Sequence, residues 1–380
     1  MTYNGKVKNG LLCLMMITAL LVLPSPGKGE PLAEHRINIS FDLAKDKIFG
    51  KVDVTFPEHL RAITVGRGLR ITKLVIDGKS EKIRVKDGRI ALPHYSGSRQ
   101  IEMEYEGIFS NQEGNNLANT IGEEGVFLIS DWFHAAETEL AHFSLQALVP
   151  ANFQAVSEAE DIIIKDMGEQ KLITFNFPHP VMNIHFITAP YVVNKDHHGG
   201  VLLETYLLPE DKNLASRYLE ASKKYVEMYE EMLGPFPFKR FAVVENILPT
   251  GYGMPTFTLL GREVLKLPFI PETSLGHEIL HSWLGNSVYV DYGKGNWSEG
   301  LTTYLADHYY EELRGNGWQY RKGIMEDFES YVHGGNEISI KDFVSGDDRS
   351  LRAVGYGKTA MVFNMLHNRV GDKAFREALR

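Results

Sequence analysis

Residues 276–283 read GHEILHSW, which places two histidines four positions apart and a glutamate directly after the first. In an α-helix, residues four apart lie about 40° apart around the axis and one turn along it, so His277 and His281 project side by side. Two imidazoles on one face can reach a single Zn²⁺ at about 2.0–2.1 Å. Glu278 is turned by about 100° from His277, so it can stand beside an attacking water without ligating the metal. The stretch therefore predicts a zinc site with its general base.

The opposing interpretation is an ordinary helix with a surface glutamate and two packed or exposed histidines, because HExxH is a short pattern with false positives. A catalytic zinc also needs a third protein ligand. After His281, the stretch NWSEGLTTYLADHYYEEL predicts another helix, with Ser298 as its N-cap and Glu299 in its first turn. The helix dipole alone would also favour an acid there. The two helices together favour one Zn²⁺ per chain, held by His277, His281 and Glu299.

Length, composition and charge narrow the class of protein. A chain of 380 residues predicts two or three domains. Hydrophobic residues make up 43% and charged residues 23%, which is typical of a soluble globular protein. The net charge of −9 disfavours nucleic acid as a partner, since phosphate binding needs clustered lysines and arginines. The sequence leaves the oligomeric state open.

The N-terminus has the pattern of a secretory signal. Lys6 and Lys8 precede an unbroken apolar run over residues 11–23, which is too short for a bilayer core that needs about 20 residues. We therefore expect a signal peptide over 1–29 and export to the periplasm or the extracellular space, with an uncleaved membrane anchor as the alternative. The single cysteine, Cys13, lies inside this segment, so any metal in the mature chain must be bound by histidine and carboxylate.

In the remainder of the chain, the spacing of apolar residues changes near Gly199 and Gly200, from a strand-like to a helix-like period. Short alternating segments bounded by turn residues predict an all-β domain over 30–198. Residues 209–234 then carry apolar positions at steps of three and four, which predicts a helix. Further helices are expected over 272–285, 298–314, 318–332 and 356–368. The second domain, 199–380, is therefore mainly helical and contains the predicted zinc site.

HEILHSWLGN and NWSEGLTTYLADHYYEE, together with GPFPFKRFAVVE and VGYGKTAMVFNML, resemble the gluzincin zinc aminopeptidases, the membrane alanyl aminopeptidase and leukotriene hydrolase family. The resemblance implies an α+β fold, in which an N-terminal all-β, saddle-like domain precedes a thermolysin-like, mainly helical catalytic domain. It assigns His277, His281 and Glu299 as zinc ligands and Glu278 as the base. It also assigns Tyr356 to the tyrosine that hydrogen-bonds the tetrahedral oxyanion, a role that a protonated phenol can fill.

The sequence departs from this family upstream of the zinc helix. Family members usually carry a Gly-x-Met-Glu-Asn strand whose glutamate holds the free α-amino group of the substrate. Here the stretch reads PTGYGMPTFTLL, so that carboxylate is missing and Pro255 removes a backbone donor. Gly251, Gly253 and Met254 are still expected to line the substrate cleft. Glu245 is a possible replacement acid, and its ordinary interpretation is a surface residue that ends a strand.

Two smaller features leave alternatives open. Asp307 can support a zinc-bound histidine from behind or be a plain surface acid. The chain stops at GDKAFREALR, within what reads as an unfinished amphipathic helix, so we expect either a fragment that lacks a C-terminal helical domain or an open cleft.

The predicted function is an exported zinc metallopeptidase that hydrolyses peptide bonds of peptide or protein substrates. It is aminopeptidase-like, with altered recognition of the N-terminal amine. The alternatives are a zinc endopeptidase or other zinc hydrolase on the same scaffold, and a non-catalytic peptide-binding module. The last is disfavoured because a pseudoenzyme has no chemical reason to keep all five catalytic and metal residues.

Overall fold

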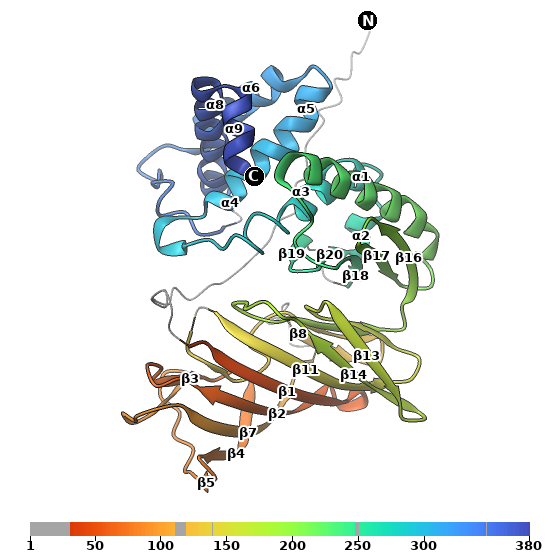
Figure 1. The fold of residues 1–380 in the computed structure, drawn as a ribbon, viewed down its shortest axis with the longest axis vertical. Helices are drawn as coiled ribbons and strands as arrows, with labels where there is room; N and C mark the ends of the chain where they lie inside the picture. The colour runs from red at the N-terminus through yellow and green to blue at the C-terminus, as the bar shows by residue number, and fades with distance from the viewer. Residues whose placement is uncertain (1–30, 111–118, 139, 248–250, 347) are drawn as a thin grey trace, which may run out of the picture.

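A computed structural model describes residues 31–110, 119–138, 140–247, 251–346 and 348–380. The predicted signal peptide over 1–29, including Cys13, lies outside these described residues. Figure 1 shows a strand-rich N-terminal part and, above it in this view, a part in which helices predominate. Within the described ranges, none of the helices combines the length and the apolar character needed to cross a membrane.

An eight-stranded sheet forms the larger layer of the N-terminal part, in the order β13-β14-β11-β1-β2-β7-β4-β5. Its strands are β1 Ala33–Asp42, β2 Lys47–Phe56, β4 Leu69–Ile76, β5 Lys79–Ser80, β7 Arg99–Ile108, β11 Ala141–Pro150, β13 Asp161–Asp166 and β14 Gln170–Asn176. Neighbours pair antiparallel except β1 and β11, which are parallel. Side chains of β11 alternate between buried and partly exposed, as expected for a sheet with one face on the core.

Two smaller sheets complete the N-terminal part. One has the order β10-β3-β6 and the other β12-β15-β9-β8. Their strands are β3 Ala62–Thr64, β6 Arg89–Ala91, β8 Asn119–Gly122, β9 Gly125–Leu128, β10 Ala135–Ala136, β12 Gln154–Val156 and β15 Phe186–Ala189.

A five-stranded sheet, in the order β16-β17-β18-β20-β19, links the strand-rich part to the helices. Its strands are β16 Val192–His198, β17 Val201–Leu207, β18 Arg240–Asn246, β19 Gly251–Met254 and β20 Phe257–Gly261. Strand β19 lies at one edge of this sheet, antiparallel to β20. This arrangement places the glycines of β19 at an edge, where an extended peptide can pair with them.

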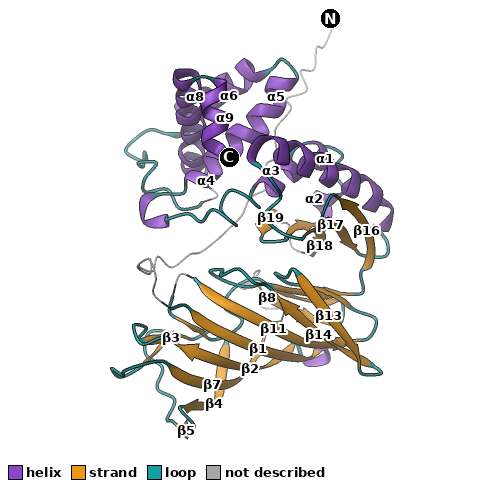
Figure 2. Ribbon diagram, in the orientation of Figure 1, coloured by secondary structure: helices purple, strands orange, loops and turns teal. Residues whose placement is uncertain are grey.

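Helices α1, α2 and α3 lie next to this sheet in Figure 2, and the later helices form a group of their own beyond them. The helices are α1 Ala215–Leu233, α2 Arg262–Leu265, α3 Ser274–Leu280, α4 Trp297–Thr303, α5 Tyr309–Leu313, α6 Gly317–Tyr331, α7 Arg349–Arg352, α8 Thr359–Val370 and α9 Asp372–Leu379. Two π-helical turns, η6 Tyr304–His308 and η7 Ala353–Lys358, join α4 to α5 and α7 to α8. Short 3₁₀ turns are η1 Leu43–Lys45, η3 Lys212–Leu214, η4 Ile270–Glu272 and η5 Tyr292–Lys294.

The order of an all-β part followed by a helical part confirms the predicted fold class. Strands predominate between residues 33 and 207, and one hydrophobic cluster continues from them into the helices. The predicted division between residues 198 and 199 falls in the turn of the β16–β17 hairpin. The division into domains itself stays a prediction.

Candidate active site

His277 and His281 lie on adjacent turns of the segment that begins with α3, as the sequence predicts. Helix α3 ends at Leu280, and His281 follows it in helical conformation, with its amide bonded to the carbonyl of His277. The two imidazole rings are 5.0 Å apart between centroids and inclined by 73°. Tighter turns replace the last part of the helix expected over 272–285, but they preserve the side-by-side projection of the two histidines.

Helix α3 packs closely against α1 through a residue without a side chain. A Cβ atom on Gly276 would clash with the hydroxyl group of Tyr310 and the ring of Tyr225. Both tyrosines are buried, at 6% and 1% exposure. The absence of a side chain at this position therefore allows the helix that carries the two histidines to sit directly on the core.

Glu299, in the first turn of α4, meets the two histidines from the facing helix. Its Oε2 lies 3.5 Å from Nε2 of His277 and 3.4 Å from Nε2 of His281. The helix is capped by Asn296, whose side chain accepts a hydrogen bond from the amide of Ser298. Ser298 as the N-cap is therefore wrong, since α4 begins one residue before it. The predicted third ligand nevertheless joins the two histidines in one buried cluster.

Hydrogen bonds on the far side of each imidazole fix which nitrogen faces Glu299. Nδ1 of His277 lies 2.7 Å from Oδ2 of Asp307, and Nδ1 of His281 lies 3.0 Å from the carbonyl oxygen of Leu284. Because both acceptors need a proton on Nδ1, each Nε2 has its lone pair available when the imidazole is neutral, the form that binds a metal. Ser298 contributes as well, since its hydroxyl donates to Leu284 O at 2.8 Å and lies 3.3 Å from His281 Nδ1. These partners orient the imidazoles as metal ligands are usually oriented.

The π-helical turn η6 explains why Asp307 reaches the zinc helix. Its wider turn shifts the residues that follow Glu299 around the helix axis, and such turns often occur at functional sites. From the sequence, Asp307 could be either a partner that supports a zinc-bound histidine or a plain surface acid. The geometry places it behind His277.

Three carboxylates crowd the two imidazoles. Burial alone would lower the pKa of His277 and of His281, but Asp307 raises the first and Glu299 raises the second. Burial would raise the pKa of Glu299, yet the two histidines hold it well below its usual range. Burial raises the pKa of Glu278, partly offset by the histidines. With neutral imidazoles the cluster carries net negative charge, which a divalent cation would offset.

The residues fit one zinc ion. One ligand atom from each of His277, His281 and Glu299 lies within 4.8 Å of the others. Tetrahedral zinc with bonds of about 2.0–2.1 Å separates its ligands by about 3.3–3.4 Å, close to the distances from Glu299 to the histidines. Nε2 of His281 is buried without a hydrogen-bond partner among the described residues. A buried atom of this kind is costly unless something binds it, and a bound zinc ion would supply that partner.

Glu278 lies beside the cluster and next to strand β19. A Cβ atom on Gly253 would lie 2.9 Å from Oε2 of Glu278, and one on Gly251 would lie 3.8 Å from Oε1. Oε2 is buried without a hydrogen-bond partner in the described part of the chain. The two glycines thus leave room for the carboxylate and bring the edge strand against it.

Tyr356 lies in the π-helical turn η7, inside the helical run from α7 to α8 rather than at a helix entrance. Burial raises its pKa well above the usual value, and the charges of Glu299 and Glu278 raise it further. Its ring packs edge-on against Phe343 at 5.9 Å between centroids. A Cβ atom on Gly355 would clash with Phe343, so this neighbour must be small. The phenol therefore stays protonated close to the two glutamates.

The residues at the position of the missing family glutamate, Met254 and Pro255, do not lie as the sequence predicts. Met254 is 7% exposed and packs in a hydrophobic cluster with Phe257 and Leu259, so its side chain does not line the cleft. Pro255 follows the end of β19, in the turn to β20, and so does not interrupt a strand. The carbonyl of Gly253 accepts a hydrogen bond from Nδ2 of Asn286 at 3.4 Å. Gly251 and Gly253 remain the residues of β19 that face the cluster.

Glu245, the possible replacement acid, is buried in β18 rather than on the surface. Its Oε2 accepts a hydrogen bond from the amide of Leu208 at 2.8 Å, and its Oε1 lies 3.5 Å from Nε of Arg262. Burial raises its pKa to about 7, and the charge of Asp211 adds to the shift. One carboxyl oxygen is therefore held by a backbone amide, and the other, Oε1, lies near Arg262 but has no hydrogen-bond partner within the described residues.

Sequence reasoning missed three contributors to the site. Leu284 acts through its backbone carbonyl, which leaves no signal in residue type. Asn286 and Ser298 contact Gly253 and His281, and the only available signal was their nearness to the zinc motifs in the chain.

Comparisons with known proteins agree with this geometry. Residues 272–380 match the peptidase family M1 domain. The chain is 21% identical, over 82% of its length, to "Probable aminopeptidase 2" of Sulfurisphaera tokodaii, and 20% identical, over 90%, to "Leucyl aminopeptidase" of Saccharolobus solfataricus. These findings support a place for the chain in the gluzincin aminopeptidase family. The chain spans about half the length of these two curated relatives, at 44% and 47%.

The fold of this chain also has a solved counterpart. An M1 zinc metallopeptidase from Deinococcus radiodurans superimposes with a TM-score of 0.72 at 16% identity, covering 93% of this chain and 86% of that one. At this identity the likeness concerns the fold, and it confirms the predicted two-part architecture.

Proposed function

We propose that this chain is a zinc metallopeptidase that hydrolyses peptide bonds in peptide or protein substrates. The observation that carries the proposal is the buried cluster of His277, His281 and Glu299, with Glu278 and the edge strand β19 beside it. An extended substrate can pair with the glycines of β19, which brings its scissile carbonyl toward the cluster. The names of the curated relatives, both aminopeptidases, support the same class of reaction.

Each residue then has a defined task. A bound zinc ion would polarise the scissile carbonyl and lower the pKa of water to near 7. Glu278, whose pKa burial raises, accepts the proton of the attacking water and passes it to the leaving amine. Tyr356 donates its phenolic proton in a hydrogen bond to the oxyanion that develops on the substrate. Asp307 holds His277 in the orientation that metal binding requires.

The role of Tyr356 predicts a large kinetic effect. Tyr356→Phe should lower kcat by about 10²–10³-fold, the usual cost of losing one oxyanion donor, because it removes the phenolic hydroxyl and keeps the ring. Zinc content and thermal stability should stay near wild type. Steady-state kinetics on one peptide, with metal analysis of the same sample, measure both quantities.

Tyr292→Phe is the matched control. Tyr292 is partly buried, and its pKa is raised to about 12 by burial and by the charge of Glu299. Its variant should keep kcat within a few-fold of wild type. A loss of turnover in Tyr292→Phe but not in Tyr356→Phe would transfer the oxyanion role to Tyr292.

Recognition of the substrate amine is the feature in which we expect this chain to differ from strict aminopeptidases. Pro255 stands where the family places its amine-binding glutamate. Glu245, the candidate replacement acid, is buried and has Leu208 and Arg262 as its neighbours. Without a charged partner in the site, a substrate with a free ammonium group gains little binding free energy over a substrate with a blocked N-terminus. This observation also favours an endopeptidase as the second candidate function.

Blocked and free peptides should therefore be cleaved at similar rates. A charge-assisted hydrogen bond is worth roughly 1.5–3 kcal/mol, or about one to two decades of selectivity. We expect kcat/KM for one peptide, N-acetylated and free, to agree within about tenfold on the same enzyme. A preference for the free amine beyond about a hundredfold would contradict the proposal. In that case Glu245→Gln would show whether the buried acid has taken the amine-binding role.

We also propose that the chain is exported, with a signal peptide over 1–29, an N-terminal β domain over 30–198 and a catalytic domain over 199–380. The support is the short apolar run over 11–23 with its preceding lysines. N-terminal sequencing of the protein recovered outside the cytoplasm tests cleavage, and an intact Met1 in that fraction would favour an anchor instead.

A further inference from the structure

A cavity of about 200 Å³ lies away from the zinc cluster, where β12, β13 and β14 of the N-terminal part face β16, β17 and β18 of the five-stranded sheet. Ile164 of β13 is 57% exposed and the Lys195 side chain 58% exposed, so the mouth of the cavity reaches solvent. A small molecule can therefore enter it.

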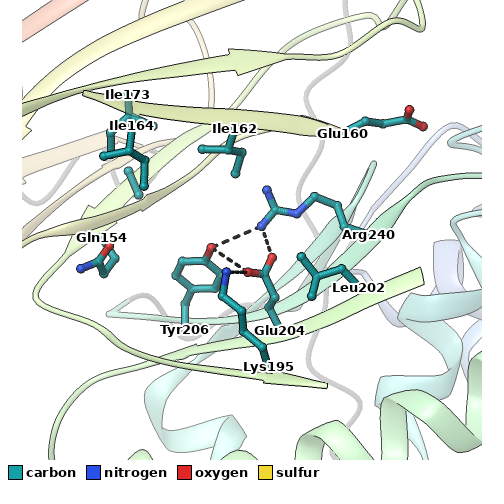
Figure 3. Close-up of a pocket in the computed structure, with 11 residues that line it drawn as sticks. Gln154, Glu160, Ile162, Ile164, Ile173, Lys195, Leu202, Glu204, Tyr206 and Arg240 are labelled. Atoms are coloured by element: carbon teal, nitrogen blue, oxygen red, sulfur yellow. Dashed lines mark hydrogen bonds and ion pairs between the residues drawn. The ribbon is translucent and has the colours of Figure 1, made fainter. Parts of the chain in front are cut away.

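The two walls of the cavity differ in chemistry (Figure 3). One wall is aliphatic, and it consists of Ile162, Ile164 and Ile173. The other wall carries the ionised and hydroxyl groups, which are those of Lys195, Glu204, Tyr206 and Arg240. Pockets that combine apolar walls with a few fixed polar groups are typical of small-molecule sites.

The polar wall carries one more positive than negative charge. Arg240, 5% exposed, pairs through Nη2 with Oε2 of Glu204, and Lys195 Nζ lies 2.9 Å from Oε1 of the same carboxylate. The hydroxyl of Tyr206 accepts from Arg240 at 3.2 Å and donates to Glu204 at 3.4 Å. Two cations thus share a single carboxylate. Glu160, which also lines the cavity, pairs with Lys239 at 3.1 Å, and Lys239 lies 4.0 Å from Asp161 as well.

Two further observations concern cationic groups near the cavity that lack some of their partners. Nε of Arg240 is buried and has no hydrogen-bond partner within the described residues. Lys171, 9% exposed, has the neutral Gln154 of the cavity lining as its partner at 3.1 Å, and no carboxylate pairs with it in the described part of the chain. Buried cations are normally paired. Arginine binds carboxylates especially well because its planar guanidinium group matches their geometry.

From these features we infer that the cavity binds a small aliphatic carboxylate, with its anionic end at Arg240 and Lys195 and its branched tail against the isoleucines. The same chemistry is offered by a free branched-chain acid and by the C-terminal carboxylate of a peptide that ends in leucine. The inference is independent of the peptidase activity proposed for the zinc cluster.

Methyl NMR on the zinc-loaded protein, labelled at isoleucine, tests this site directly. Addition of 3-methylbutanoate should shift the methyl signals of Ile162, Ile164 and Ile173 in a saturable manner. The signals of Ile163, which is on the same strand but outside the cavity lining, and of Ile279 in the zinc helix should stay in place. Titration with 3-methylbutanamide, the uncharged analogue, should require at least about tenfold higher concentration, equivalent to about 1.4 kcal/mol. A dipeptide, N-acetylglycyl-leucine, distinguishes a peptide C-terminus from a free acid as the source.

A pair of variants on exposed positions removes the risk of unfolding. Ile164→Glu adds a negative charge at the mouth of the cavity and should weaken binding of 3-methylbutanoate at least about tenfold. Ile163→Glu, at a position that is 60% exposed in the same strand, should leave the affinity unchanged. The inference is overturned if the cavity isoleucines do not shift, if the amide binds as tightly as the acid, or if both variants lose affinity equally. Shifts confined to Ile279 would also overturn it, because they would place the ligand at the zinc cluster.

Discussion

Replacing Glu278 with glutamine is expected to lower kcat by about 10²–10⁴-fold, the range of general acid–base catalysis, while one zinc ion per chain stays bound. The variant keeps the size of the side chain, so it still fits beside Gly253. Among the three carboxylates of the cluster, Glu299 lies against both histidines and Asp307 hydrogen-bonds the far side of His277. Glu278 does neither, so the substitution leaves the contacts of the two histidines intact. Peptide hydrolysis and metal content, measured on the same preparation, give the result.

Glu272→Gln is the control for this variant. Glu272 lies in η4, just before the zinc helix, and its side chain is 54% exposed. Its loss should change kcat less than twofold, since surface substitutions rarely have larger effects. Loss of zinc in Glu278→Gln with activity retained would contradict the assignment, because it would make Glu278 a ligand rather than the base.

Glu299→Ala is expected to weaken zinc binding by more than about 100-fold, since loss of a partner behind a ligand already costs about 10–100-fold. The variant leaves only the two histidines as protein ligands, so turnover should fall as the zinc content falls. Competition with a chelator of known affinity measures the zinc affinity of each variant.

Asp307→Asn supplies an intermediate case. Its amide can no longer accept the charge-assisted bond from Nδ1 of His277, now 2.7 Å long, so zinc affinity should fall by about 10–100-fold. Wild-type zinc affinity in Glu299→Ala, or a larger loss in Asp307→Asn than in Glu299→Ala, would show that the ligand set is wrong.

The zinc ligands could be predicted from the sequence because their arrangement depends on local geometry. Four-residue spacing in a helix places His277 and His281 together whatever the rest of the fold does. The assignment of Glu299 required one further assumption, namely that the helix that begins near Glu299 faces the helix that carries the two histidines. The resemblance to the gluzincins supported this assumption. The predicted cap at Ser298 was wrong by two residues, because Asn296 is the cap, and helix ends are usually uncertain by one or two residues.

Other features could not be predicted because they depend on tertiary structure. The π-helical turn that brings Asp307 to His277 has no signature in residue type. The ordinary interpretation of Glu245 was a surface residue that ends a strand, yet it is buried beside Leu208 and Arg262. Met254 was expected in the cleft, but the strand presents its side chain to the opposite face from Gly253. Which face of a short strand is buried depends on what packs against it.

The most direct test of the account is a titration of metal-free protein with zinc, followed by peptide hydrolysis at each addition. The account predicts no turnover without metal and a linear rise that ends at one zinc per chain, because His277, His281 and Glu299 form one site. Full activity in the metal-free protein, or zinc bound at that stoichiometry without any hydrolysis of free or blocked peptides, would contradict it.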